Sequence, residues 1–280
     1  MSRNFMQMLE AKWAEGKFVC VGLDPDEDKI PQEDLPPSEP IFYSFCTKIV
    51  EATRDLVCAY KPNLAFFLAH GSDGVRSLED IIDKIHKIAP DVPVILDAKV
   101  ADIGNTNNGY TKFAFDRLEA DAITVHPYLG QEALKPFLDR KDKGVIVLCR
   151  TSNPGAGEFQ DLRIPNSFEV AVDNRDLEKL NPRLYEFVAH RVMHRWNANG
   201  NCCLVAGATY PDELAAIRKI APDMPLLIPG VGKQGGDVSR VVKAAGGKRM
   251  VINSSSGIIF AEDPRQATRD LNKQIDLARL

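Results

Sequence analysis

Eight short apolar runs, rich in β-branched residues, recur along this chain of 280 residues. Each run is nearly continuous in apolar residues instead of alternating with polar ones, which is typical of strands buried on both faces of a parallel sheet. The segments between most of the runs carry the apolar spacing of helices. The runs lie at residues 18–23, 57–62, 92–99, 121–127, 144–150, 201–208, 225–231 and 249–255.

Eight strands that alternate with helices predict the α/β class and a (β/α)8 TIM barrel. A doubly wound open sheet would also alternate, but it usually has fewer strands, and no GxGxxG motif follows the first run. Because no clear linker interrupts the pattern, we expect residues 1–280 to form a single (β/α)8-barrel domain with an extra N-terminal helix. The other helices are expected at residues 73–88, 112–118, 132–138, 184–197, 211–220, 238–245 and 264–280.

The charge and composition of the chain indicate a soluble, cytoplasmic protein. The formal net charge is −4, which gives no reason to expect nucleic acid or an anionic membrane as a partner. No apolar run approaches the roughly 20 residues that cross a bilayer. The amphipathic N-terminal segment carries acidic residues, unlike a signal peptide.

The cysteines and histidines do not form a recognisable metal-binding pattern. The six cysteines have no CxxC spacing and lie mostly in apolar runs, which predicts reduced thiols packed as small apolar side chains. His190 and His194 form an HxxxH pair, but the Glu and the third ligand of a metalloprotease are missing. We therefore expect no metal site.

Polar side chains gather where the predicted strands end, and in this fold catalytic residues lie at the carboxyl ends of the strands. After the last two strands the chain reads PGVGKQGGD (229–237) and NSSSGI (253–258), where barrels commonly bind phosphate. Glycines such as Gly232 let the backbone approach an anion closely, which predicts a phosphate site. The other polar residues at strand ends are Asp24, Lys61, Asp97, Lys99, His126, Arg150, Thr151, Ser152 and Thr209.

The stretch VILDAKVADIGNT (94–106) places Asp97, Lys99 and Asp102 at the end of the third predicted strand. Residues 97 and 99 lie two apart on a strand, so we expect their side chains to share one face, where the carboxylates keep the lysine protonated. A carboxylate about 4 Å from a substrate carboxylate would repel it by on the order of 4 kcal/mol at an effective dielectric near 20. The lysine could then protonate the carbanion left by decarboxylation. A salt-bridge network that closes the barrel mouth explains the same spacing, and the spacing alone leaves both interpretations open.

Together these motifs closely resemble the orotidine 5′-phosphate decarboxylase family, and more narrowly its longer bacterial-type branch. The family hallmark D-x-K-x-x-D-I-x-x-T is present as DAKVADIGNT (97–106). FVCVGLDPD and YKPNLAFF precede it, and LCRTSNPGAGEFQDL, VAGATYPDEL, IPGVGKQGGD and NSSSGI follow it in order, so the matches run over about residues 5–270. The resemblance implies cofactor-independent decarboxylation of orotidine 5′-phosphate to UMP in pyrimidine biosynthesis.

The resemblance also implies roles for matched residues around the reacting base and ribose. Lys99 would protonate C6 of the pyrimidine, and Asp97 would face the departing carboxylate. Lys61 would hold the charge network and a ribose hydroxyl, and Asp24 would bind the ribose. Ser152 matches the residue that reads the edge of the pyrimidine.

Further matched residues would act across a subunit interface or on the phosphate. Asp102, as part of the catalytic group, would reach into the site of a second subunit together with Ile103 and Thr106, which would make a homodimer obligatory for catalysis. Gln234 would bridge the phosphate and a loop that closes over the substrate, close to Gly232.

One position departs from the family pattern. The family usually reads N-S-S-R-G-I after the eighth strand, and its arginine grips the phosphate, whereas this chain has Ser256 there. Loss of a charged hydrogen bond costs about 1.5–3 kcal/mol, or roughly tenfold to 150-fold in affinity. Lys233 and Arg249 are candidates for supplying the missing charge. Because the other residues of the catalytic group are present, we expect the chemistry to survive in weakened form.

Two alternative functions remain at this point. A metal-dependent sugar-phosphate lyase of the same superfamily, acting on 3-keto-gulonate phosphate or hexulose phosphate, shares the D-x-K-x-x-D element. Such a lyase needs magnesium and an acidic ligand on the second strand, where this chain has Lys61. A non-catalytic nucleotide-binding paralogue is suggested by Ser256 and opposed by the complete set of charged residues at the strand ends.

Overall fold

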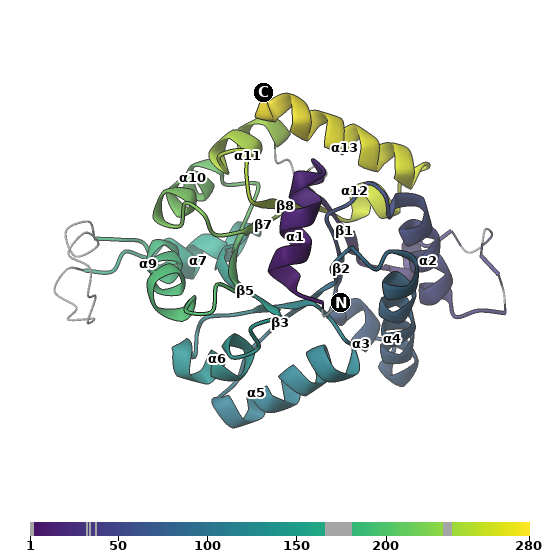
Figure 1. Cartoon of the computed structure of the whole chain (residues 1–280), viewed down its shortest axis with the longest axis horizontal. Helices are drawn as coiled ribbons and strands as arrows, with labels where there is room; N and C mark the ends of the chain where they lie inside the picture. Colours follow the sequence, from purple (N-terminus) through teal and green to yellow (C-terminus); the bar gives the residue numbers. More distant parts are fainter. Residues whose placement is uncertain (1–2, 32, 34, 37, 166–180, 232–236) are drawn as a thin grey trace.

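The computed structural model describes residues 3–31, 33, 35–36, 38–165, 181–231 and 237–280. Its eight strands are parallel and match the eight apolar runs of the sequence. The hydrogen-bonded order is β2-β1-β8-β7-β6-β5-β4-β3, and bridges from Tyr60 to Val94 and from Asn63 to Asp97 join the two outermost strands. The sheet therefore closes into the predicted (β/α)8 TIM barrel, seen end-on in Figure 1. The strands are β1 (Val19–Leu23), β2 (Ala59–Pro62), β3 (Ile95–Val100), β4 (Ala122–Val125), β5 (Gly144–Arg150), β6 (Cys202–Ala206), β7 (Leu226–Pro229) and β8 (Met250–Ser254).

Helices surround the barrel, and some are preceded or followed by short turns of 3-10 or π-helix. The α-helices are α1 (Phe5–Ala14), α2 (Ile41–Thr53), α3 (Leu64–Leu68), α4 (Gly71–Ile88), α5 (Gly104–Thr111), α6 (Gly130–Leu138), α7 (Gly157–Gln160), α9 (Leu184–Arg191), α10 (Pro211–Ile220), α11 (Val238–Ala244), α12 (Ser256–Ile259) and α13 (Pro264–Arg279). The shorter turns are η1 (Glu27–Lys29), η3 (Lys112–Arg117), η4 (Pro154–Ala156) and η5 (Val192–Trp196). Each of the predicted helical ranges contains a helix, whereas α2, α3, α7 and α12 were not predicted.

One helix begins earlier than its sequence indicates. A helix was expected from residue 112, but α5 begins at Gly104 and continues into the π-helical turn η3. The segment GNTNNGYT of α5 has no apolar period, so tertiary contacts hold it in place. The Asn107 amide, which is fully buried, donates to the carbonyl oxygens of Asp102 and Ala133, both at 2.6 Å.

Mostly small and medium-sized side chains fill the interior of the barrel. Two side chains of α1, the aromatic Phe5 and the aliphatic Leu9, complete this core from the amino ends of the strands. Gly144 at the start of β5 makes room for them, because a Cβ there would lie 2.2 Å from the Phe5 ring. The other residues of this core are Cys58, which directly precedes β2, and the strand residues Cys20, Ala59, Ile95, Ala122, Ile146, Cys203, Val205, Leu227 and Val251.

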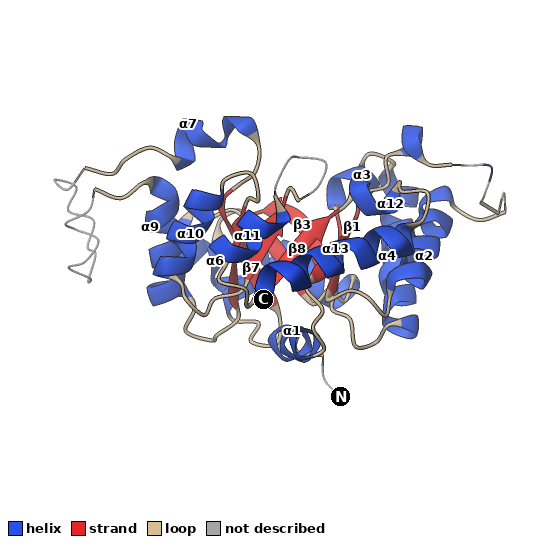
Figure 2. Ribbon diagram, turned by 90° about the horizontal axis from the view of Figure 1, so that it is seen from above, coloured by secondary structure: helices blue, strands red, loops and turns tan. Residues whose placement is uncertain are grey.

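The N-terminal helix α1 closes one end of the barrel and leaves the other end open to the loops. Figure 2 shows α1 on one side of the strands and α7 and α12 on the other. The helix is fastened by a hydrogen bond from the Trp13 indole to the carbonyl of Met250, at 2.8 Å, and by an ion pair between buried Lys12 and Asp91. Its placement directs any ligand site to the carboxyl ends of the strands.

All six cysteines are buried and free, as predicted. Burial raises the pKa of the Cys20 thiol to about 12, so this barrel-interior cysteine stays a neutral apolar group. None of the helices within the described residues is both long enough and apolar enough to span a bilayer.

Candidate active site

A cavity of about 440 Å³ opens at the carboxyl ends of the strands. Polar side chains from the ends of five strands line it. They are Asp24 after β1, Lys61 on β2, Asp97 and Lys99 on β3, Thr124 on β4 and Asn253 on β8. Within the described residues, Lys61 and Lys99 are the cations that line this cavity.

A buried chain of charges forms the centre of the site. The Asp97 carboxylate lies between two ammonium groups, with Oδ2 2.7 Å from Lys61 Nζ and Oδ1 2.6 Å from Lys99 Nζ. Lys61 Nζ also lies 3.8 Å from Asp24 Oδ1. Lys61 and Asp97 are only 3% and 7% exposed, whereas the Lys99 side chain is 49% exposed. Of these charged side chains, Lys99 is therefore the one that a ligand in the cavity can reach most easily.

The ionised states of this charge chain sustain one another. Burial disfavours the Asp97 carboxylate, but the charges and hydrogen bonds of Lys61 and Lys99 outweigh it and hold the pKa of Asp97 well below its usual value. Burial likewise disfavours the Lys61 ammonium, and the carboxylates of Asp24 and Asp97 overcome it, so the pKa of Lys61 is raised above its usual value. Asp97 and Lys61 consequently stay charged at neutral pH.

Lys99 and Asp97 meet by a different route from the one predicted. Regular strand alternation was expected to place them on one face, but the pairing of β3 with β4 is irregular between Leu96 and Val100, and Lys99 has φ of +50°. This left-handed conformation is uncommon for a residue other than glycine and is found preferentially at functional sites. The Lys99 ammonium is thus placed by a local distortion of β3.

Thr124 holds this distorted segment and was not singled out from the sequence. Its hydroxyl accepts a hydrogen bond from the Lys99 backbone N–H at 2.9 Å and donates one to Asp97 Oδ1 at 2.8 Å. The residue is 1% exposed and lies on β4, within the apolar run AITV. A single hydroxyl in an otherwise apolar strand that ends at the cavity is the signal that could have identified it.

Two carboxyl and amide oxygens face the interior of the site without a hydrogen-bond donor among the described residues. They are Oδ1 of Asp24 and Oδ1 of Asn253. Both residues line the cavity, Asp24 at the end of β1 and Asn253 on β8. A buried acceptor without a donor is costly, so these atoms are suited to bind hydroxyl or amide hydrogens of a ligand.

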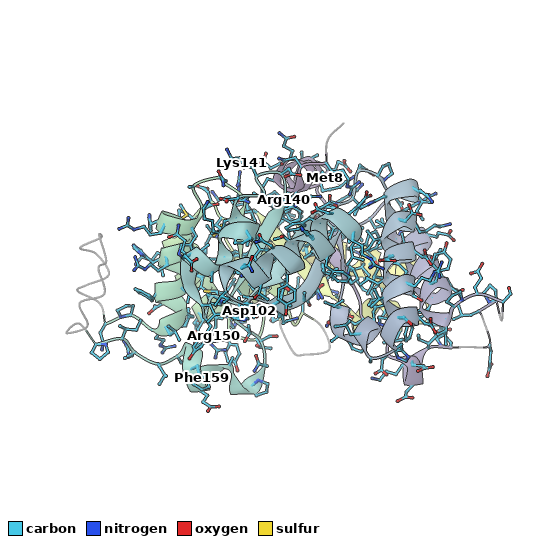
Figure 3. All side chains as sticks on the ribbon, turned by 90° about the horizontal axis from the view of Figure 1, so that it is seen from below. Met8, Asp102, Arg140, Lys141, Arg150 and Phe159 are labelled. Atoms are coloured by element: carbon cyan, nitrogen blue, oxygen red, sulfur yellow. The ribbon has the colours of Figure 1, made fainter. Side chains whose placement is uncertain are left out.

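Asp102, Ile103 and Thr106 lie outside this cavity, although the sequence places them only a few residues after Lys99. Asp102 Oδ1 accepts a hydrogen bond from the Ile103 backbone N–H at 2.6 Å. Ile103 is 62% exposed, and Thr106 is also exposed. Asp102 is labelled in Figure 3 at the same end of the barrel as Arg150, opposite Met8 of α1.

The glycine-rich loop after β7 and the serine-rich loop after β8 also line the cavity. Gly230, Ser255, Ser256 and Gly257 line it, and Ser256 begins the short helix α12. Two predicted phosphate-binding residues, Gly232 and Gln234, lie outside the described residues, as does Lys233.

The suggestion that Arg249 supplies the missing phosphate charge is wrong. Arg249 precedes β8 and therefore lies at the amino end of the barrel, whereas Ser256 follows β8 at the carboxyl end. Its guanidinium is bound there to Glu10 Oε1 at 2.9 Å and to the carbonyl of Asp223 at 3.0 Å. The predicted strand 249–255 already has Arg249 at its start and Ser256 just past its end, so six residues of strand and turn lie between the two.

Ser152 lines the cavity on the loop that follows β5, and Thr209 Oγ1 donates to its carbonyl oxygen at 3.0 Å. A second cavity, of about 740 Å³, adjoins this loop between α6 and α9 and is lined mainly by apolar and aromatic side chains. His126, predicted at a strand end, faces this second cavity. Leu148 and Gln160 line both cavities and form the wall between them.

Comparisons with known proteins agree on one family. The family model described as "Orotidine 5′-phosphate decarboxylase / HUMPS family" matches residues 17–271. The chain is 47% identical over 262 residues to an orotidine 5′-phosphate decarboxylase of Azoarcus sp. (strain BH72), covering 92% of this chain and 90% of that one. It is similar to the structure of Leishmania donovani OMP decarboxylase, with a TM-score of 0.82, 36% identity and coverage of 99% and 98%. It is also similar to Leishmania donovani UMP synthase, with a TM-score of 0.86 and 37% identity, but spans 57% of that longer chain.

Proposed function

The chain belongs to the orotidine 5′-phosphate decarboxylase / HUMPS family, and from this premise we propose how its site decarboxylates orotidine 5′-phosphate to UMP in pyrimidine biosynthesis. The observation that carries the proposal is the ionised Asp97 held between Lys61 and Lys99 at the wall of the cavity. We assign Lys61, Asp97 and Lys99 to the chemical step within one subunit.

In the proposed step, the bond between C6 of the pyrimidine and its carboxylate breaks, and the electron pair stays on C6 while carbon dioxide departs. The Lys99 ammonium then gives a proton to C6, which yields UMP, and the Lys99 amine regains a proton from water. An ammonium fixed beside the developing carbanion stabilises it without reorganisation of solvent. Repulsion between Asp97 and the substrate carboxylate, which disappears as carbon dioxide leaves, is a second contribution whose general importance is disputed.

The rest of the cavity is assigned to the rest of the nucleotide. Asp24 has an oxygen without a donor and is assigned to a ribose hydroxyl, together with Lys61. Ser152 is assigned to the edge of the pyrimidine. The phosphate is assigned to the loops after β7 and β8, which include Gly232, Gln234 and Ser256.

We also propose that Asp102, Ile103 and Thr106 act in the site of a second copy of the chain. Their positions outside the cavity of their own subunit support this assignment. Ile103 is itself a large exposed apolar side chain. Tyr128, which follows the adjacent strand β4, is 90% exposed. Large exposed apolar and aromatic side chains are typical of protein interfaces.

Mixed dimers test this shared site. The Asp102→Ala and Lys99→Ala variants should each be inactive, but a mixed dimer would contain one site with both residues intact. Random exchange of equal amounts should restore about a quarter of the wild-type turnover, because half of the dimers are mixed and each has one intact site. Turnover that stays absent after proven subunit exchange would refute the assignment of Asp102 to the partner's site.

The alternative of a metal-dependent sugar-phosphate lyase is not favoured by the geometry. Such an enzyme needs an acidic ligand on the second strand, whereas Lys61 occupies that strand end and its ammonium is bound to Asp97. A non-catalytic paralogue keeps its support from Ser256 alone.

One assay separates these functions. The ultraviolet absorbance of orotidine 5′-phosphate is followed with the unmodified protein, in the presence of a chelator, beside the Ser256→Arg variant. Turnover that does not depend on metal supports the decarboxylase. A lyase would leave orotidine 5′-phosphate unchanged and would instead cleave 3-keto-gulonate phosphate or hexulose phosphate in a reaction that the chelator abolishes. Recovery of activity only in Ser256→Arg would identify a decarboxylase disabled at its phosphate loop. Inactivity of both proteins, with retained binding of UMP, would favour the paralogue.

A further inference from the structure

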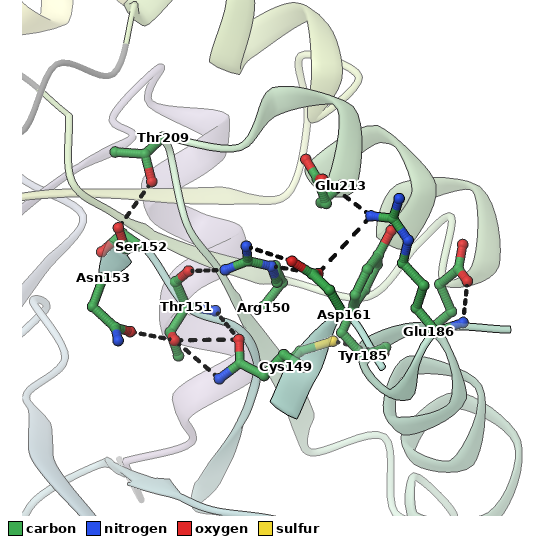
Figure 4. A network of polar contacts seen from close by, with 12 residues as sticks. Cys149, Arg150, Thr151, Ser152, Asn153, Asp161, Tyr185, Glu186, Thr209 and Glu213 are labelled. Carbon is green, nitrogen blue, oxygen red and sulfur yellow. Dashed lines mark hydrogen bonds and ion pairs between the residues drawn. The ribbon is translucent and has the colours of Figure 1, made fainter. Parts of the chain in front are cut away.

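The loop that carries Ser152 is fastened from behind by a charged pair that does not line the substrate cavity. Arg150, the last residue of β5, is 2% exposed. Its Nε and Nη2 each donate to one carboxylate oxygen of Asp161, both at 3.0 Å. Figure 4 shows this two-pronged contact at the centre of the network. Such a planar pairing fixes the direction of both groups as well as their distance.

Arg150 also holds the first residue of the loop and is itself held by a ring. Its Nη1 donates to the carbonyl oxygen of Thr151 at 2.8 Å. Its guanidinium lies 3.8 Å from the centre of the Tyr210 ring, a cation–π contact. One buried side chain therefore grips the start of the loop at Thr151 and its end at Asp161.

Between these two ends, the loop is closed by the side chain of Gln160. Gln160 Oε1 accepts the Thr151 backbone N–H at 2.9 Å, and Gln160 Nε2 donates to Thr151 Oγ1 at 3.0 Å. Thr151, Ser152, Asn153 and Gln160 all line the substrate cavity. The face of the loop that meets the ligand is thus set by contacts on its opposite face.

Regular secondary structure contributes little to the shape of this loop. It contains the 3-10 turn Pro154–Ala156 and the four-residue helix α7, neither of which is long enough to be stable alone. Gly207, which directly follows β6, limits its approach to the barrel, because a Cβ there would lie 2.7 Å from the Ser152 backbone. Loss of the Arg150–Asp161 pair would therefore let the loop move outward, and Gln160 would no longer separate the substrate cavity from the apolar one beside it.

We propose that Arg150 and Asp161 are positioning residues that set the geometry of pyrimidine recognition by the loop 151–160. The proposal rests on the function assigned above, in which Ser152 reads the base. A hydroxyl binds a base well only over a few tenths of an ångström and a narrow range of angles, so a loop released at both ends would lose base recognition. The ribose and phosphate contacts come from other strands and would be retained.

The test compares Asp161→Asn with the matched control Glu213→Gln, which removes one carboxylate charge from the same network. Glu213 lies 3.3 Å from Arg183 and, within the described residues, is joined to Asp161 only through that arginine. Calorimetry measures the binding of UMP and of ribose 5-phosphate to each protein. We expect Asp161→Asn to weaken UMP binding by about tenfold, as for one lost charged hydrogen bond, with ribose 5-phosphate unchanged within about twofold. The control should bind both ligands as the unmodified protein does.

Two results would overturn the positioning role. Unchanged binding of UMP by a folded Asp161→Asn variant would show that the pair is dispensable. An equal loss of affinity for UMP and for ribose 5-phosphate would show a general effect on the fold. The double variant Arg150→Met/Asp161→Asn separates charge burial from positioning, because it leaves no buried unpaired charge. It should still bind UMP about tenfold more weakly, and full recovery would again overturn the proposal.

A readout without substrate keeps this test independent of the assigned function. Hydrogen exchange of the backbone amides in residues 151–160, above all the Thr151 amide bound by Gln160, should speed up in Asp161→Asn and stay unchanged in Glu213→Gln. Unchanged exchange in both variants would show that the Arg150–Asp161 pair does not hold the loop, whatever ligand the protein binds. Faster exchange in a protein that never binds UMP would support the role of the Arg150–Asp161 pair in holding the loop and would refute the function assigned to the site.

Discussion

The two ends of the barrel contain similar charged groups in opposite surroundings. At the amino end, α1 covers the strands, and buried Lys12 is paired with Asp91, neither of which lines the 440 Å³ or the 740 Å³ cavity. At the carboxyl end, buried Lys61 is paired with Asp97, but the pair forms the wall of a cavity, and an oxygen of Asp24 there has no donor among the described residues.

This difference shows which charges serve the fold and which serve a ligand. A buried ion pair says little by itself, because it contributes modestly to stability and is found in both settings. Unpaired acceptors and a strained backbone cost free energy that a closed core would avoid. The amino end also has a left-handed residue, Arg249, and a buried oxygen without a donor among the described residues, in Asn201. What distinguishes Asp24 and Lys99 is that they line the cavity, where a ligand can complete their contacts.

Replacing Lys99 should lower the activity more than any other change at the carboxyl end. Lys99→Ala removes the proposed proton donor, so kcat should fall by about 10²–10⁴-fold or more, whereas the unfolding midpoint should change little because the side chain is half exposed. The matched variant at the other end is Lys12→Ala, which should lower the unfolding midpoint and leave kcat of the folded protein unchanged. Normal turnover by Lys99→Ala, or a loss of kcat in Lys12→Ala, would contradict the division between the ends.

Adding a charge at the phosphate side should sharpen the same division. Ser256→Arg should raise kcat/KM by roughly tenfold to 150-fold, the equivalent of about 1.5–3 kcal/mol from a charged hydrogen bond. Because remote phosphate binding contributes to the chemical step, the gain should be larger in kcat/KM than in the affinity for UMP. Uridine, which lacks the phosphate, serves as the control ligand and should bind the two proteins equally. An equal gain for uridine would show that the arginine acts elsewhere.

The Thr124 hydroxyl tests whether the distortion of β3 matters. Thr124→Val keeps the shape of the side chain but removes its hydrogen bonds to Lys99 and Asp97, so kcat should fall by about tenfold, equivalent to roughly 1.4 kcal/mol. Thr268→Val is the control, because it removes a similar buried hydrogen bond to the carbonyl of Pro264 within α13. The expected outcome is reduced stability in both variants and reduced kcat only in Thr124→Val. Equal kcat values would remove Thr124 from the positioning of Lys99.

The sequence was sufficient for the barrel because its strands are apolar on both faces, and all eight runs became strands. It was insufficient where tertiary contacts decide the local conformation. Helix α5 has no apolar period and depends on the Asn107 amide, and the left-handed Lys99 depends on a hydroxyl from the next strand. Arg249 is close to Ser256 in the sequence, but it precedes the strand that Ser256 follows, so the length of β8 separates the two side chains in space.

The predicted site residues fall into three groups. The structure places Asp24, Lys61, Asp97, Lys99, Ser152 and Ser256 around one cavity. It also places Asp102 outside that cavity, and the role proposed for Asp102 requires a second subunit. Gly232 and Gln234 fall outside the described residues, so their roles stay predictions. The sequence had no pattern for Asp161, whose partner Arg150 is recognisable only once the loop is folded.

The smallest effect on turnover is expected at the amino end, from Gly144→Ala. The new Cβ would lie 2.2 Å from Phe5 Cδ1 and 2.8 Å from the Ala122 Cβ, so α1 must shift outward. Overpacking of this kind costs about 1–3 kcal/mol, which lowers the unfolding midpoint by a few degrees for a chain of this size. The double variant Gly144→Ala/Phe5→Leu should recover part of this loss, because the smaller side chain relieves the contact. Since the cavity lies at the opposite end, kcat of the folded protein should be unchanged. A fall in kcat at an unaltered midpoint would mean that α1 influences the active site through the barrel, and the two ends could no longer be treated as independent.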